Sequence, residues 1–156
     1  MMDRLATSAR MDAPARLLGT WRISGDFGPG EMSTGTARFE WLPGNRFILL
    51  RWSFDAPGLP DGVAVIGADA AGEGHLLHLF DSRGIARVYW MDFESGLVSL
   101  ERTVGDFSPL VVAQRFRGAF SADGVTIEGV WEQSHDGSDW EHDLTITFTR
   151  QERDGA

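Results

Sequence analysis

The chain contains no cysteine and no lysine. Without cysteine it has no disulfide, no thiolate nucleophile and no cysteine-ligated zinc or iron–sulfur site. Without lysine it has no residue for a Schiff base or for a phosphate-binding lysine of the P-loop type. Any chemistry must therefore come from His, Asp, Glu, Tyr, Ser or Arg side chains.

Positive charge is scarce. The 14 basic residues, all of them arginine, are outnumbered by 23 acidic residues, which gives a net charge of -9. The resulting field repels phosphate backbones and anionic lipid headgroups. We therefore expect neither a nucleic-acid partner nor a membrane partner. Because the sequence also lacks a signal-peptide pattern and an apolar run of membrane length, we expect a cytoplasmic protein.

Helical periodicity is nearly absent from a chain whose 156 residues suit a single domain. Asp12 as an N-cap, followed by Pro14, predicts one short helical turn. Beyond it, runs rich in β-branched and aromatic residues alternate with clusters of Gly, Pro, Asp and Ser, a pattern typical of all-β proteins. The predicted strands cover residues 19–27, 35–42, 46–54, 62–69, 75–81, 85–93, 97–104, 112–120, 125–133 and 140–150.

The connections predict how these strands are joined. Residues 81–84 and 121–124 have the composition of tight hairpin turns, so consecutive strands should be antiparallel neighbours. A meander of about ten strands closes because closure removes its exposed edges. The sequence thus predicts a single antiparallel up-and-down β-barrel over residues 12–150. Residues 1–11 are interpreted as a disordered N-terminal extension and residues 151–156 as a disordered tail.

Alternate connections differ in length, which predicts two unlike ends of the barrel. Connections at one end are short turns, whereas those at the other are mostly longer. Long loops on a rigid scaffold commonly surround a binding site, so we expect the barrel to open at that end. The longer connections are residues 28–34, 55–61, 105–111 and 134–139.

The segment Gly19-Thr20-Trp21 resembles the G-x-W signature of lipocalins and the wider calycin superfamily. The resemblance implies a calycin-like barrel in which the tryptophan packs across the closed end beneath an arginine of the last strand, the position of Arg150. The stretches FEWLPGNRF, FDSRG and WEQSHDGSDWE further resemble uncharacterised lipocalin-like barrel proteins of bacteria, distant relatives of the haem-binding nitrobindins. That relationship implies a haem-ligating histidine near the C-terminus, and His142 is the residue that can be aligned with it.

Side-chain alternation along each strand predicts which residues face the interior. In 140–150 the inward set includes Trp140 and His142. A histidine in an apolar barrel is either hydrogen-bonded to a core partner or positioned for a ligand, and both alternatives remain open. The predicted ligand-binding residues are His78, Trp90, Phe116, Trp131, Trp140 and His142.

The parity of 85–93 is ambiguous. Either Arg87 and Tyr89 face the interior, or Trp90 and its alternate neighbours do. We favour an interpretation in which Arg87, Arg115 and Arg117 lie on the solvent face in pairs with acids. No metal site is expected, because His75 and His78, three residues apart on one strand, face opposite sides, and 135–139 (HDGSD) is interpreted as a hairpin rather than a calcium loop.

Three functions follow, in order of preference. The first is binding of a small, largely apolar or amphipathic molecule, with no catalytic residues, because no nucleophile–base pair is evident. The second is a small decarboxylase or isomerase that uses Tyr89, Arg87 and His142 for proton transfer. The third is haem binding through His142. A homodimer is an open alternative to a monomer.

Overall fold

The computed structural model describes residues 10–26, 32–70, 74–107, 109 and 111–152. It is an all-β barrel preceded by a single 3-10 turn, η1 (Pro14–Leu17). The strands are β1 (Gly19–Asp26), β2 (Met32–Trp41), β3 (Phe47–Phe54), β4 (Gly62–Ala68), β5 (His75–Asp81), β6 (Ala86–Glu94), β7 (Leu97–Arg102), β8 (Ala113–Phe120), β9 (Thr126–Ser134) and β10 (Glu141–Arg150).

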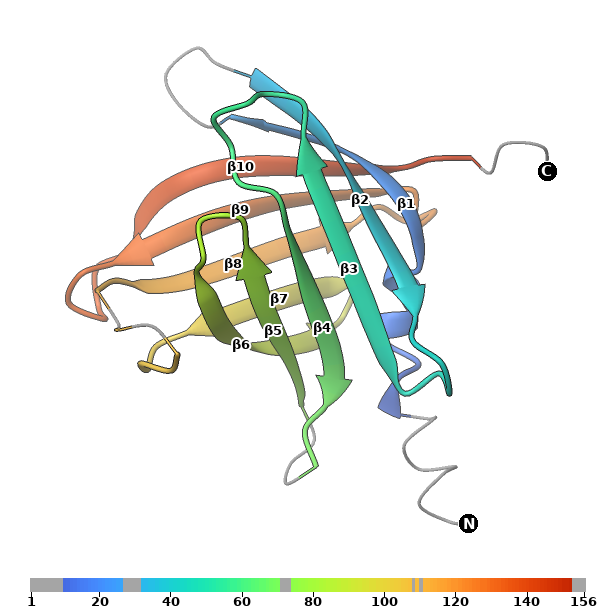
Figure 1. Ribbon diagram of the computed structural model, residues 1–156, viewed down its shortest axis with the longest axis horizontal. Coiled ribbons are helices and arrows are strands. Elements are labelled where there is room, and N and C mark those ends of the chain that lie inside the picture. Colours follow the sequence, from blue (N-terminus) through green and yellow to red (C-terminus); the bar gives the residue numbers. More distant parts are fainter. Residues whose placement is uncertain (1–9, 27–31, 71–73, 108, 110, 153–156) are drawn as a thin grey trace.

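Each strand pairs antiparallel with the next, and β1 also pairs with β10, so the sheet closes on itself (Figure 1). This confirms the predicted up-and-down barrel of about ten strands with a short N-terminal helical turn. Strand β2 begins at Met32, three residues earlier than expected, and residues 28–31 of the first predicted loop lie outside the described residues. No helix within the described part of the chain is long and apolar enough to cross a bilayer.

The N-terminal boundary of the barrel lies earlier than expected. Met11 is only 1% exposed and belongs to the hydrophobic core. The backbone oxygen of Arg10 lies 2.6 Å from Nε2 of His75 in β5. The barrel domain therefore includes Arg10 and Met11, whereas residues 1–9 and 153–156 of the predicted extension and tail lie outside the described residues.

The helical turn starts differently from the prediction. Its N-cap is Ala13, with no side-chain capping hydrogen bond, so the expectation that Asp12 caps it is wrong. The backbone oxygen of Met11 accepts a hydrogen bond from the amide of Ala15 instead. Burial of Met11 therefore anchors the turn.

One end of the barrel is closed by Trp21, whose side chain is fully buried. Its indole Nε1 donates to the backbone oxygen of Leu17 over 2.7 Å, and the Arg150 guanidinium lies 4.1 Å from its ring centroid. Arg150 also donates to the backbone oxygens of Leu18 and Arg16. The implied arrangement of tryptophan and last-strand arginine is thus present, and we call these residues the floor.

Gly19 is required at this floor. Its φ of +120° is unfavourable for a residue with a side chain, and a Cβ there would lie 3.1 Å from Nη1 of Arg150. The glycine of the G-x-W segment therefore lets the arginine approach the tryptophan closely.

Candidate functional site

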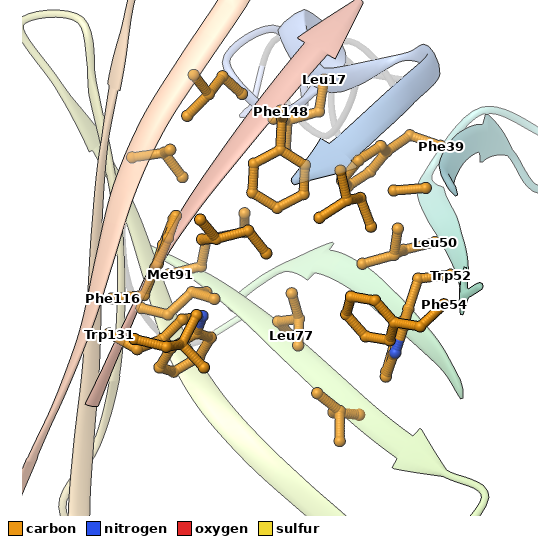
Figure 2. A pocket seen from close by; sticks show the side chains of 18 residues that line it. Leu17, Phe39, Leu50, Trp52, Phe54, Leu77, Met91, Phe116, Trp131 and Phe148 are labelled. Atoms are coloured by element: carbon orange, nitrogen blue, oxygen red, sulfur yellow. The ribbon is translucent and has the colours of Figure 1, made fainter. Parts of the chain in front are cut away.

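Above the floor, the barrel interior contains an open cavity of about 210 Å³ whose lining side chains are all apolar. They come from η1 and from every strand except β4. Figure 2 shows them surrounding an open centre, with Trp52 and Phe54 facing Phe116 and Trp131 across it. For comparison, an apolar cavity of roughly 150 Å³ accommodates benzene. The lining residues are Leu17, Ile23, Ala37, Phe39, Leu50, Trp52, Phe54, Leu77, Leu79, Met91, Val98, Leu100, Phe116, Ile127, Trp131, Leu144, Ile146 and Phe148.

Two of the predicted ligand-binding residues, Phe116 and Trp131, line this cavity. Their ring centroids lie 5.3 Å apart, on the neighbouring strands β8 and β9. The Phe116 ring lies directly against the backbone at Gly129, where an added Cβ would overlap the ring. The glycine therefore creates the recess that holds this part of the cavity wall.

His142 does not point into the barrel, so that prediction is wrong. The side chain is exposed, and its Nε2 lies 2.8 Å from Oγ1 of Thr145. The pairing of β10 with β9 shifts register between His142 and Leu144. Such an irregularity breaks the side-chain alternation, which is why Leu144 faces the cavity and His142 does not.

The other three predicted residues also lie away from the cavity. His78 alternates with the cavity-lining residues of β5 and therefore lies on the outer face. Trp90 is 53% exposed on the outside of β6. Trp140 precedes β10, and the Arg115 guanidinium lies 4.1 Å from its ring centroid. The six residues are thus not brought together in one place.

The ambiguous strand is resolved in favour of Tyr89, which is only 2% exposed and faces inward. Its hydroxyl donates to Oε1 of Gln114 over 2.9 Å, and Nη1 of Arg87 donates to the same oxygen over 3.2 Å. Burial raises the pKa of the Tyr89 phenol, although the neighbouring Arg87 acts in the opposite direction. The Tyr89 ring also contacts Trp131 edge-on, with centroids 5.7 Å apart, so this polar group adjoins the cavity wall.

Of the three arginines that we expected on the solvent face, two lie there and one does not. Arg115 does form the expected pair, with its Nε 2.8 Å from Glu132, and this hydrogen bond lowers the pKa of Glu132. Arg117 is exposed on the same strand. Arg87 instead lies on the inward face with Tyr89 and Gln114. Its Nε is buried without a hydrogen-bond partner among the described residues. Its expected position on the solvent face is therefore wrong.

A buried ion pair that sequence reasoning missed lies beside this cluster. Arg102 is 3% exposed, and its Nε and Nη2 lie 2.9 and 3.0 Å from the two carboxylate oxygens of Asp106. This hydrogen bonding raises the pKa of Arg102. Asp106 also accepts a hydrogen bond from the backbone amide of Val88. The four-residue spacing of Arg102 and Asp106 at a strand end was the signal that could have revealed the pair.

The described residues do not fit haem or a metal ion in the cavity. No described histidine is among the cavity-lining side chains. Within the described part of the chain, no group of three His, Asp or Glu side chains is arranged to hold a metal. In the 135–139 loop, which joins the antiparallel strands β9 and β10, the Asp136 carboxylate accepts hydrogen bonds from the amides of Ser138 and Asp139.

The closed meander, the arginine-covered tryptophan and the apolar interior together define a calycin-like barrel. The fold is similar to the crystal structure of Rv2717c from M. tuberculosis, with a TM-score of 0.62 and 16% sequence identity over 92% of this chain and 98% of that chain. Comparison with models of protein families gives no match, and neither does comparison with curated protein sequences. The similarity therefore concerns the fold.

Proposed function

We propose that this protein binds a small, largely apolar molecule inside the barrel. The carrying observation is the wholly apolar lining of a cavity of about 210 Å³. Protein interiors are otherwise close-packed. An unfilled apolar cavity leaves its lining side chains without packing partners. A bound apolar molecule would supply those packing contacts, and the calycin-like fold supports the same proposal.

The two alternatives receive less support from the geometry. Proton transfer by Tyr89, Arg87 and His142 requires the three side chains to meet at one substrate, but the His142 side chain lies on the exposed surface. The raised pKa of Tyr89 also makes the phenol a weaker acid. Haem binding through His142 would place the haem outside the cavity. We therefore propose neither.

A fluorescence titration with the neutral probe N-phenyl-1-naphthylamine tests the proposal. We expect saturable binding by the unmodified protein and a loss of at least about tenfold in Leu77→Trp, because the new indole would occupy the cavity. Leu76→Trp is the matched control, since Leu76 alternates with Leu77 and lies on the outer face. Unfolding curves for both variants show that each is folded.

No saturable binding by the unmodified protein would contradict the proposal. So would unchanged binding by a folded Leu77→Trp variant, because the probe would then occupy a different place. Native mass spectrometry of the purified protein gives an independent result, in which a co-purified small molecule should be absent from Leu77→Trp.

A further inference from the structure

The barrel interior holds two arginines on neighbouring strands, and only one of them has a carboxylate partner. Arg102 binds both oxygens of Asp106 through its Nε and Nη2. The hydrogen bond shown for Arg87 goes to the neutral amide oxygen of Gln114. Among the described residues, Nε of Arg87 has no partner although it is buried. Arg87 therefore contributes a positive charge that no described carboxylate pairs with.

One edge of the Arg87 guanidinium contains the buried Nε that has no hydrogen-bond partner among the described residues. Nη1 is occupied by Gln114, whereas Nε belongs to the same edge of the group that Arg102 uses to hold Asp106. That edge presents two parallel N–H groups and matches the two oxygens of a carboxylate. A partly buried charge without a partner is costly, and an anion placed there would remove that cost.

Strand pairing places this group at the edge of the cavity. Arg87 pairs across strands with Leu79, and Leu79 is one of the cavity-lining residues. One inward position deeper on the same strand, Tyr89 packs against Trp131 of the cavity wall. Arg87 and Gln114 are each the second residue of their strands, β6 and β8, and both strands begin at the long-loop end. On this side, the polar side chains of Arg87, Tyr89 and Gln114 therefore border the apolar cavity.

We propose that Arg87 forms an anion-binding subsite at the mouth, which takes the carboxylate of an amphipathic monocarboxylate whose apolar part fills the cavity. This inference rests on the proposed function. The apolar part lies between the Leu79 and Trp131 sides of the cavity, and its head group meets the free edge of Arg87. Because the protein carries a net charge of -9, selectivity for an anion has to come from this local group.

Displacement of N-phenyl-1-naphthylamine by decanoate and by decan-1-ol tests the subsite, since the two compounds share a chain and differ in head group. We expect the unmodified protein to prefer decanoate by about tenfold or more. Arg87→Met should abolish this preference while retaining the affinity for decan-1-ol. Arg117→Met is the matched control, because it removes the same charge from the outer face of β8 and should leave the preference unchanged.

Two further measurements make the result independent of how well Arg87→Met folds. Arg87→Lys keeps the charge but loses the paired N–H edge, so it should retain only part of the preference. In the unmodified protein, lowering the pH through the pKa of decanoate itself should reduce its affinity toward that of decan-1-ol.

The outcomes separate the two proposals. Equal affinities for decanoate and decan-1-ol, or a preference that survives in folded Arg87→Met, would overturn the Arg87 subsite and leave the apolar binding function in place. If the unmodified protein bound none of the three compounds, namely the probe, decanoate and decan-1-ol, both the subsite and the apolar binding function would be overturned.

Discussion

The arginines at the two ends of the barrel differ in how completely their guanidinium groups are hydrogen-bonded. At the floor, Arg150 donates to two backbone oxygens and covers the face of Trp21. At the mouth, Arg87 donates to one neutral amide oxygen and retains a buried Nε without a partner among the described residues. An arginine whose N–H groups have acceptors contributes to the stability of the fold. An arginine with an N–H group that lacks an acceptor can still bind an anion.

The connections at the two ends follow the same division. At the floor, η1 packs beneath the strands, and β6 joins β7 through a turn of two residues. At the mouth, β3 and β4 are joined by residues 55–61, and β7 and β8 by residues 103–112. We infer that substitutions at the floor lower stability without changing ligand preference. Substitutions at the mouth should change ligand preference more than stability.

The largest effect is expected for Trp21→Ala at the floor. Replacing a fully buried tryptophan by alanine typically costs about 3–5 kcal/mol, through lost burial and the cavity left behind. The hydrogen bond to Leu17 and the contact with Arg150 are lost as well. Urea-induced unfolding should show a correspondingly lower free energy of unfolding.

Trp90→Ala is the control for this measurement. Trp90 is 53% exposed on the outer face, and substitutions at such sites usually change stability by only about 0.5 kcal/mol. If both variants lost the same free energy of unfolding, Trp21 at the floor would contribute no more to stability than Trp90 on the outer face.

A smaller effect, on both stability and probe binding, is expected for Gly129→Ala in the cavity wall. The new methyl group would overlap the Phe116 ring and push it toward the cavity. Overpacking of this kind costs about 1–3 kcal/mol. Binding of N-phenyl-1-naphthylamine should weaken at the same time, as measured by fluorescence titration.

Gly58→Ala in a mouth loop is the matched control for that substitution. A Cβ at Gly58 would meet no atom within 4 Å, so stability and probe binding should both stay unchanged. Unaltered probe binding by Gly129→Ala would show that the Phe116 side of the wall does not contact the ligand.

Sequence alone predicted the barrel because its signals are local. Alternating strands, tight turns and the G-x-W segment each span a few residues, and they led to the correct placement of Phe116 and Trp131. The orientation of His142 could not be predicted in this way. It depends on a register shift in the pairing of β10 with β9, and that shift is a property of two strands together.

Strand β6 was ambiguous for a different physical reason. Its outer face carries Val88 and Trp90, so both faces contain apolar residues and alternation gives no contrast. The pairing of Arg102 with Asp106, and hence the isolation of Arg87, depends on how the β7–β8 loop folds back over β6. The volume of the cavity is likewise a result of packing around the whole barrel.

The smallest effect concerns the rim loop after β9, where hydrogen bonds from the amides of Asp139 and Ser138 hold the pKa of Asp136 well below its usual range. Because this pKa is lower in the folded than in the unfolded protein, the ionised carboxylate stabilises the fold above the unfolded pKa of about 3.9. That contribution is lost as the pH falls through this value toward the folded pKa. Asp136→Asn should therefore reduce the acid sensitivity of thermal unfolding measured over a pH series. Asp139→Asn removes a charge from the same loop but keeps the Asp136 acceptor, so it should retain the sensitivity. An identical pH profile for Asp136→Asn and the unmodified protein would show that this rim carboxylate contributes nothing to stability.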